Sequence, residues 1–550
     1  MAYLKKILCV VLSFFLILSI QAVAMDDTTD LDQFERLFPS RIIPEDAEVT
    51  RVAPSPTGFP HIGTALQIVL NKAVANRVEG GVFLLRIEDT DRSRTVAGAQ
   101  ESIFDCMEWL GLVADESPTN PGVYGPYIQS ERLQIYKIAA EHLRKTGFAY
   151  PCFCSAERLE HLRSQMSLEK IPPKYDGFCR SINKLEAEER MYREPYVIRL
   201  IMPEDQDIIC KDLIRGEVKF NSANLDDMVI FKSDGFPTYH LASVVDDHFM
   251  RVTTVIRGEE WLSSTPKHVL LYNYFGWDSP KFVHTPVLRD EQRKKLSKRN
   301  GDTSINWFKK QGILPQVFRN FLSRLVWGHP EGLDVYPFAD FCRLLRIENL
   351  STSGPVVDYN LLLHISSQYL SNLDPETKVA EIRRYLDFVK SDTLEVSKLP
   401  SMDIESSLSP EYLNLFCEEF SHDFDRSINI VRVLADRLKR LTDIFQYDYF
   451  FPRFYKQPLI EEMEISLKTQ TIRPILLELD SLSVITSRFT HAERESMLRE
   501  LASRHTVKVG TVFMVLRSIL TNKTNTPNIF DILDILGFEE SDRRLKLVLS

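Results

Sequence analysis

The sequence lacks both glycine-rich loops that most often bind nucleotide phosphates, since neither G-x-G-x-x-G nor G-x-x-x-x-G-K-[ST] occurs in its 550 residues. It also lacks the cysteine density of a disulfide scaffold, with only eight cysteines in the whole chain. No internal repeat or low-complexity tract is present, and a hydrophobic content of 44% excludes a mostly disordered or fibrous protein. A nucleotide site in this chain must therefore bind phosphate through a different motif.

Positive charge is also scarce, because 67 lysines and arginines stand against 77 aspartates and glutamates. The net charge of −10 argues against a protein coated in basic charge for nucleic acid. The average hides a local exception, since the stretch from Arg289 to Arg299 is rich in lysine and arginine. A nucleic-acid site would therefore be a local basic track rather than a whole basic face.

The N-terminal apolar run covers residues 7–20, which is shorter than the roughly 20 residues of a membrane-spanning helix. Two lysines precede this run and a small-x-small site follows it, a pattern typical of a secretory signal. The alternative is that translation starts at Met25. In either case residues 1–24 are excluded from the fold, and the polar, proline-containing stretch 25–48 is predicted to be a linker.

The segments that follow predict an α/β fold. Residues 49–53 resemble a strand, residues 62–74 place apolar side chains on one helical face, and residues 82–87 form a largely apolar strand. Strand, helix and strand are the beginning of a doubly wound, Rossmann-type parallel sheet. We assign this catalytic domain to residues 49–115 and 226–304.

A polar insertion, residues 116–225, separates the two halves of the predicted sheet and holds a group of cysteines. Beyond residue 304 strand patterns become scarce and helical periodicity dominates, for example over residues 314–325 and 428–445. A chain of this length is too long for one core. We therefore predict two further all-α domains, 305–385 and 386–550.

Two segments offer phosphate chemistry in place of a glycine-rich loop. His61 and Gly63 stand at the start of the first helix, where free backbone N–H groups favour phosphate and a missing Cβ allows close approach. The basic segment Lys295–Arg299 could close over a triphosphate and neutralise its charge. Taken singly, each has a common alternative, a helix cap for His61 and a solvated loop for the basic segment, but the pair is far more specific.

This pair resembles the two signatures of class I aminoacyl-tRNA synthetases. Further motifs resemble the glutamyl-tRNA synthetase family in order along the chain: Arg51–Gly58, Leu85–Asp91, Tyr239–Asp247, Val255–Trp261 and Lys295–Arg299. The similarity runs from Val49 to the C-terminus, with Leu296 in place of the signature methionine. The resemblance therefore covers both the predicted sheet and the helical half.

The resemblance implies that the chain activates L-glutamate with ATP and Mg²⁺ and transfers it to the 3′ end of tRNA(Glu). It assigns the insertion to the acceptor stem, residues 305–385 to stem contacts and residues 386–550 to the anticodon. It further implies a cytoplasmic monomer without stable membrane association. Charging of tRNA(Gln) as well as tRNA(Glu) is a second option that depends on the anticodon contacts.

The substrate carries two carboxylates and an ammonium group, so its pocket should contain arginines and at least one anion. By resemblance the glutamate site consists of Arg51, Ala53, Ser55, Glu88, Tyr239, Ser243 and Arg257. The ATP site consists of Pro54, His61, Gly63, Thr64, Glu260, Val287, Leu288 and Lys298. The catalytic residues are His61, Gly63, Lys295, Ser297 and Lys298. Ser243 stands where relatives often have asparagine, and Tyr239 could equally be a core aromatic.

The insertion contains Cys152, Cys154 and Cys179, and three thiols can hold a structural zinc ion, whose sites usually have four ligands. Some members of the resembling family bind zinc with this Cys-x-Cys and Tyr-x-x-x-Cys spacing. The resemblance therefore makes Tyr175 the fourth ligand, with His161 as the weaker candidate. The alternative is three reduced, partly buried thiols without metal.

Three other functions fit parts of the sequence. A tRNA-modifying glutamyl-transferase paralogue would lack the anticodon-binding half, whereas this chain continues for about 240 residues beyond the basic segment. A glutaminyl-tRNA synthetase is expected to end in β-barrels rather than helices. An exported binding protein derived from a synthetase would suit the signal-like start, but it would not need both ATP signatures and both pocket arginines.

Overall fold

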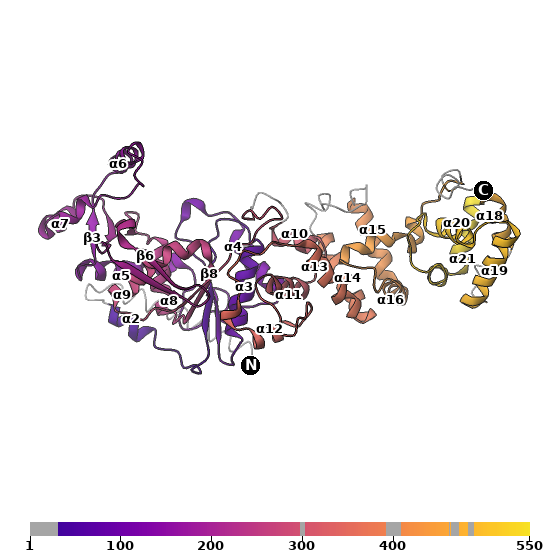
Figure 1. Ribbon diagram of the computed structural model, residues 1–550, viewed down its shortest axis with the longest axis horizontal. Helices are drawn as coiled ribbons and strands as arrows, with labels where there is room; N and C mark the ends of the chain where they lie inside the picture. Colours follow the sequence, from indigo (N-terminus) through magenta and orange to yellow (C-terminus); the bar gives the residue numbers. More distant parts are fainter. Residues whose placement is uncertain are drawn as a thin grey trace. The chain divides into compact units, whose positions relative to one another are not determined.

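The computed structural model describes residues 31–296, 303–391, 409–460, 463, 472–481 and 489–549 (Figure 1). The signal-like segment 1–24 and the predicted catalytic residues Ser297 and Lys298 lie outside the described residues. The chain divides into two compact units. The first comprises residues up to Ile305 together with Phe318–Asp358, and the second comprises Asn306–Val317 together with Tyr359–Ser550.

The first unit is built on a six-stranded sheet with the order β2-β1-β8-β9-β5-β6. Its strands are β1 (Val49–Val52), β2 (Val82–Leu85), β8 (Thr254–Gly258), β9 (Lys281–Thr285), β5 (Asp207–Asp212) and β6 (Gly216–Asn221). All neighbours are parallel except β5 and β6, which are antiparallel. The predicted α/β class is confirmed, with an antiparallel strand added at one edge.

The helices of this unit follow the predicted apolar pattern. They are α3 (Ile62–Ala75), α4 (Ala99–Leu110), α5 (Leu133–Lys145), α8 (Tyr239–Phe249) and α9 (Thr265–Phe275). In α3 the side chains spaced by three and four residues, such as Ile62, Leu66 and Val69, are all buried. Helix α3 contacts β1, β2 and β8, and therefore places its N-terminus near the carboxyl ends of these strands.

The insertion does not have the predicted boundaries. Strands β5 and β6 lie within residues 116–225 but extend the main sheet, whereas β7 (Val229–Phe231) pairs with β4 (Val197–Leu200) in the three-stranded sheet β3-β4-β7. The first strand of that sheet is β3 (Ala149–Cys152), and the insertion also carries helices α6 (Ala156–Leu168) and α7 (Lys184–Met191). Strand pairing is a long-range contact, so local composition could not assign these strands to their sheets.

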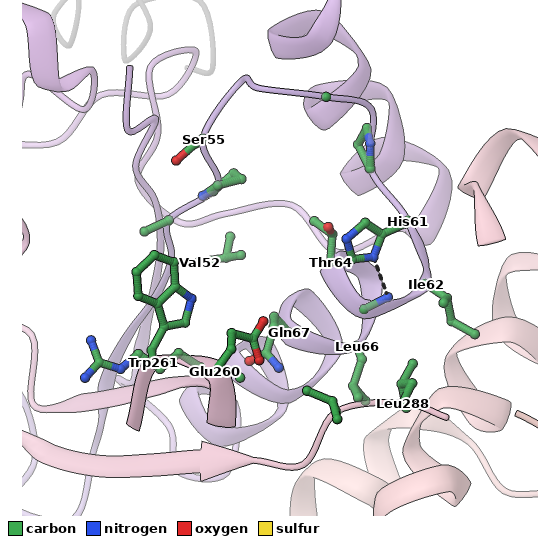
Figure 2. Close-up of a pocket in the computed structure, with 18 of the residues that line it drawn as sticks. Val52, Ser55, His61, Ile62, Thr64, Leu66, Gln67, Glu260, Trp261 and Leu288 are labelled. Carbon is green, nitrogen blue, oxygen red and sulfur yellow. Dashed lines mark hydrogen bonds between the residues drawn. The ribbon is translucent and has the colours of Figure 1, made fainter. Parts of the chain in front are cut away.

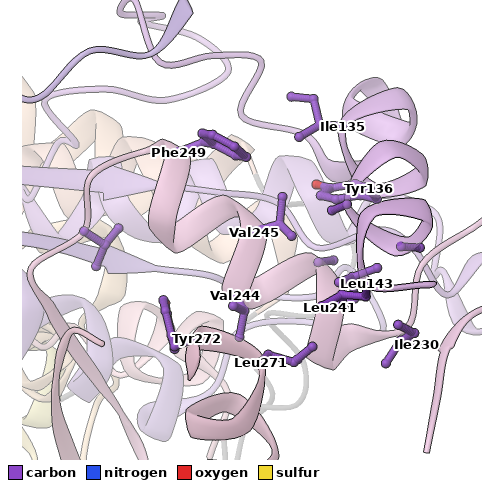
Figure 3. Packing of buried hydrophobic residues seen from close by; sticks show 14 of the residues in the cluster. Ile135, Tyr136, Leu143, Ile230, Leu241, Val244, Val245, Phe249, Leu271 and Tyr272 are labelled. Atoms are coloured by element: carbon purple, nitrogen blue, oxygen red, sulfur yellow. The ribbon is translucent and has the colours of Figure 1, made fainter. Parts of the chain in front are cut away.

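The predicted linker 25–48 is wrong for the part that the structure describes. Residues Leu31–Leu37 form helix α2, and Leu31, Phe34 and Phe38 belong to the buried core of the catalytic unit. The rings of Phe34 and Phe38 lie 5.9 Å and 5.8 Å from the ring of Phe249. Figure 3 shows Phe249 in this core on α8, beside Val245 of the same helix and near Tyr136 of α5. The segment is polar on average, and this composition concealed the three apolar side chains Leu31, Phe34 and Phe38.

No β-strand follows β9 in the described part of the chain, which agrees with the predicted helical half. These helices are α10 (Ile305–Lys310), α11 (Pro315–Val326), α12 (Phe338–Leu344), α13 (Tyr359–Asn372), α14 (Pro375–Ser391), α15 (Pro410–His422), α16 (Phe424–Val433), α18 (Ile472–Ser481), α19 (His491–Arg504), α20 (Val509–Thr521) and α21 (Ile529–Leu549). Within the described ranges, no helix combines the length and hydropathy needed to cross a membrane.

The predicted internal boundaries of this half differ from the structure. Residues 318–358 belong to the first unit, where the ring of Phe318 lies 5.4 Å from that of Trp109. The boundary at residue 385 falls inside α14, whose buried face continues through Leu386 and Val389. The helix expected over residues 428–445 is wrong, since α16 ends at Val433 and a 3₁₀ run begins at Leu441.

Substitution of Phe34 by alanine tests whether residues 31–48 belong to the core. Because Phe34 is fully buried, Phe34→Ala should lower the free energy of unfolding of the catalytic unit by about 3–5 kcal/mol. Urea unfolding followed by tryptophan fluorescence measures this change, since the ring of Trp277 lies 5.4 Å from that of Phe249. The control Ile42→Ala removes a fully exposed side chain and should change stability by less than about 0.5 kcal/mol. Equal effects of both substitutions would restore the linker interpretation.

Candidate active site

A cavity of about 440 Å³ opens where the parallel strands β1, β2, β8 and β9 reach their carboxyl ends (Figure 2). This is the edge at which open α/β sheets bind ligands. Most of the predicted site residues line it: Arg51, Ala53, Pro54, Ser55, His61, Gly63, Thr64, Glu88, Tyr239, Arg257, Glu260, Val287, Leu288 and Lys295. Segments that are far apart in the sequence therefore meet in one cavity.

His61 is the N-cap of α3, and its Nδ1 accepts a hydrogen bond of 3.0 Å from the backbone N–H of Gly63 (Figure 2). Because Nδ1 accepts, the proton of a neutral ring lies on Nε2, which can donate to an anion. A Cβ at position 63 would lie only 2.9 Å from Cε1 of His61. His61 therefore caps α3, and a side chain at position 63 would have to displace its ring.

Arg51 and Glu88 belong to a buried network of charges. Nε of Arg51 donates to Oδ1 of Asp247 at 3.0 Å, and Nη1 of Arg86 donates to the same oxygen at 2.7 Å. Nη2 of Arg86 donates to Oε1 of Glu88 at 3.0 Å. Burial raises the pKa of Glu88 against the opposing charges of Arg86 and Arg51. Burial also acts to raise the pKa of Asp247, but Arg51 and Arg86 together lower it.

Arg257 is held differently, by hydrogen bonds to uncharged groups. Its Nη1 donates to the hydroxyl of Tyr239 at 3.2 Å, and its Nε donates to Nε2 of His284 at 3.0 Å. Tyr239 lines the cavity, and its ring centroid lies 4.4 Å from that of Trp261. Burial raises the pKa of Tyr239, which keeps the phenol neutral. Tyr239 is therefore a cavity residue as well as a packed aromatic.

Ser243 is the one predicted glutamate-site residue that does not line the cavity. It is fully buried on α8 one turn after Tyr239, and its Oγ has no hydrogen-bond partner among the described residues.

Several lining or supporting residues were missed by the sequence analysis. Gln67 lines the cavity one turn beyond Thr64 and donates to Oγ1 of Thr285 at 2.8 Å. Trp261 and Asp247 stand at the ends of two motifs whose earlier residues were assigned. The helical spacing of Gln67 from Gly63 was a signal that could have identified it.

The two acidic residues after β8 have separate partners. Glu260 lines the cavity, and a Cβ on Gly258 would lie 2.6 Å from its Cδ, so glycine makes room for this carboxylate. Oε1 of Glu259 accepts from the backbone N–H of Val287 at 3.0 Å, and Oε2 accepts from Arg215 at 2.7 Å. Glu259 therefore fixes the chain beside the cavity rather than lining it.

The predicted metal residues form a separate cluster in the insertion. The Sγ atoms of Cys152, Cys154 and Cys179 all lie within 4.8 Å of one another. The hydroxyl of Tyr175 lies 3.4 Å from Sγ of Cys152 and 3.5 Å from Sγ of Cys154. His161 is exposed on α6 and is not part of this cluster. The donors that meet are therefore three thiols and one phenol.

Comparison with known proteins identifies the family. Residues 48–363 match the family described as tRNA synthetases class I (E and Q), catalytic domain, and residues 401–549 match an anticodon binding domain. The glutamate–tRNA ligase of Gloeobacter violaceus is 45% identical over 94% of this chain and 98% of its own length. The chain belongs to the glutamate–tRNA ligase family. It is therefore an aminoacyl-tRNA synthetase with glutamate–tRNA ligase activity.

Other relatives agree with this assignment. The glutamate–tRNA ligase of Thermus thermophilus is 41% identical over 91% of this chain and 100% of its own length. Among solved structures, a glutamate–tRNA ligase from Elizabethkingia meningosepticum in complex with its amino acid has a TM-score of 0.78 at 30% identity. That comparison covers 92% of this chain and 99% of the other. The glutamate–tRNA ligase relatives thus share both the sequence and the fold.

Gly63→Ala tests the close approach of His61 to the start of α3. The added Cβ should displace the imidazole, so the rate of tRNA-dependent ATP–pyrophosphate exchange should fall by about 10-fold to 100-fold. The matched control is Gly510→Ala, which also changes the second residue of a helix but has no neighbouring atom within 4 Å of the new Cβ. Wild-type exchange by Gly63→Ala would show that the ligase does not need His61 in this position.

Proposed function

We propose that the cavity at the carboxyl ends of β1, β2, β8 and β9 binds glutamate and ATP together. In this proposal Arg51 and Arg257 bind the two substrate carboxylates and Glu88 binds the ammonium group, with Ala53, Ser55 and Tyr239 completing the glutamate site. The supporting observation is that Arg51 of β1, Arg257 of β8 and Glu88, which follows β2, line a single cavity. Arginine matches a planar carboxylate with two donors, and a buried carboxylate suits an ammonium ion.

The first step needs positioning and positive charge rather than a protein nucleophile. The α-carboxylate oxygen of glutamate attacks the α-phosphorus of ATP, the bond to the bridging oxygen breaks, and pyrophosphate leaves. We propose that Nε2–H of His61 donates to phosphate oxygens, that Lys295 and Lys298 neutralise the developing charge, and that the hydroxyl of Ser297 donates a hydrogen bond to a phosphate oxygen. The remaining ATP contacts come from Pro54, Gly63, Thr64, Glu260, Val287 and Leu288. Mg²⁺ would enter the site bound to the phosphates of ATP.

In the second step a ribose hydroxyl at the tRNA 3′ end attacks the glutamyl carbonyl carbon, and AMP leaves. We propose that the insertion contacts the acceptor stem, that the helices directly after the basic segment make further stem contacts, and that the C-terminal helices within residues 401–549 bind the anticodon of tRNA(Glu). The match of residues 401–549 to an anticodon binding domain supports the last assignment and argues against a paralogue that lacks this half. ATP and uncharged tRNA occur inside cells, so we place this reaction in the cytoplasm, with the monomer as its unit.

A charging assay with purified tRNA(Glu) and tRNA(Gln) tests this proposal and its substrate range. The chain should attach glutamate to tRNA(Glu) with ATP and Mg²⁺, and glutamylation of tRNA(Gln) would define it as non-discriminating. Lys298→Ala should slow pyrophosphate exchange by more than about 100-fold while changing the KM for glutamate less than about threefold. Unchanged exchange in this variant, measured with tRNA present, would contradict the proposed ATP site.

We propose in addition that Cys152, Cys154, Cys179 and Tyr175 hold one structural zinc ion. The donor set fits the ion, because three thiols and a phenol oxygen meet within a few ångströms and thiolate is a preferred zinc ligand. The bound ion would cross-link β3 to the 3₁₀ turn at Phe178–Ser181 and thereby stabilise the outer part of the insertion.

Elemental analysis of the purified chain should find about one zinc per chain. Cys179→Ser should lose most of this metal, and Tyr175→Phe should lower its affinity without removing the thiolates. The control Cys342→Ser changes a buried cysteine on α12, outside the cluster, and should retain full occupancy. A metal-free wild-type chain with three titratable thiols would support the alternative of reduced cysteines.

A further inference from the structure

The guanidinium of Arg257 is surrounded by neutral acceptors. Besides its bonds to Tyr239 and His284, its Nη1 lies 3.2 Å from Nδ1 of His268 and its Nη2 donates to Oγ1 of Thr265 at 3.1 Å. Among the residues that the structure describes, no carboxylate forms an ion pair with Arg257. Arg51, in contrast, pairs directly with Asp247. The two cavity arginines thus differ in how much of their charge is already neutralised.

The hydrogen bond to Arg257 determines the protonation of His284. Arginine has donors only, so Nε2 of His284 must accept the 3.0 Å bond from Nε of Arg257. The ring proton therefore lies on Nδ1, which donates to Oδ2 of Asp212 at 2.7 Å. The hydroxyl of Thr265 lies 3.1 Å from the same Nε2 and can donate to it as well. Arg257, the imidazole and the carboxylate form one directional chain.

Asp212 is suited to fix this tautomer because all its contacts are donors. Oδ2 accepts from the backbone N–H of His284 at 2.9 Å as well as from its ring, and Oδ1 accepts from the backbone N–H groups of Ile214 and Arg215. Asp212 is 5% exposed as a residue and ends β5, beside β9. Strand β5, which belongs to the insertion, therefore supports Arg257 through Asp212 and His284.

In the hydrogen bond between Arg257 and His268, Arg257 is again the donor and the ring nitrogen is the acceptor. Nδ1 of His268 must accept from Arg257, so its Nε2–H donates to Nδ1 of His240 at 3.2 Å. Burial and the charge of Arg257 lower the pKa of His268, and burial lowers the pKa of His284 although Asp212 opposes this. Both rings that contact Arg257 are thus neutral acceptors.

We propose that Asp212 and His284 are positioning residues for glutamate binding: Asp212 fixes the His284 tautomer that accepts from Arg257, which keeps the guanidinium oriented and its charge available for a substrate carboxylate. This inference rests on the proposed role of Arg257 in the glutamate site. Without the carboxylate, the ring can take the other tautomer, in which Nε2–H faces Nε–H of Arg257 and the two donors repel.

Asp212→Asn is the direct test, because an amide must place its NH₂ group against N–H donors that the carboxylate accepted. The KM for glutamate in tRNA-dependent pyrophosphate exchange should rise about tenfold, while the KM for ATP and the kcat change less than about twofold. The matched control is Asp207→Asn on the exposed part of the same strand, which makes the same charge change and should leave all three constants unaltered. A purely structural role would change the KM for ATP, kcat and the thermal midpoint together.

A double-mutant cycle with His284→Gln separates the tautomer effect from local structure. Glutamine offers an amide oxygen to Arg257 and has no ring tautomer, so His284→Gln should raise the KM for glutamate less than about threefold. Asp212→Asn should then add less than about twofold to the KM in the His284→Gln background. Full additivity of the two substitutions, or an unchanged KM in Asp212→Asn, would overturn the inference.

Arg257→Ala distinguishes this failure from failure of the proposed function. If Arg257→Ala raises the KM for glutamate and Asp212→Asn does not, only the positioning role is wrong. If Arg257→Ala leaves the KM for glutamate unchanged, the proposed glutamate site is wrong and the positioning role falls with it.

Discussion

The buried guanidinium of Arg86 is the constraint on which the catalytic unit depends. It is completely shielded from water and is balanced by Asp246, Asp247 and Glu88. Removing one partner of such a buried network costs about 3–5 kcal/mol, because the remaining charge is left uncompensated. Arg132 at the start of α5 also donates to Asp246 at 2.7 Å. The network thus fixes α8 and α5 to the segment after β2. It also positions the two charged side chains Arg51 and Glu88, which face the cavity.

The two cavity arginines show how the surroundings of a charge determine its use. Arg51 shares Asp247 with Arg86, so part of its positive charge is neutralised before any substrate binds. Arg257 is oriented by phenol, hydroxyl and imidazole groups that carry no charge. A buried charge without a counter-ion is unfavourable, and an anionic ligand relieves this cost. The arrangement therefore favours the entry of a carboxylate on the Arg257 side of the cavity.

Local motifs predicted most of the residues that line the cavity, because the members of each motif are close together along the chain. His61 and Gly63 share one helix start, and Arg51, Ala53 and Ser55 follow one strand end. Prediction failed where the outcome depended on distant partners. Residues 31–48 have a linker's composition, yet Phe34 and Phe38 pack their aromatic rings against Phe249 of α8. Composition averages over a segment, whereas packing depends on single well-placed side chains.

The sequence by itself determined the α/β class, the helical second half and the glutamate–tRNA ligase family, because periodicity and motifs are local properties. Only the tertiary structure decided which strands share a sheet and what supports each charged group. Strand β5 comes from the insertion but joins the main sheet, and its Asp212 reaches Arg257 through His284. These three residues are separated by long stretches of chain, and their hydrogen bonds exist only because β5, β9 and β8 are neighbours in the folded sheet.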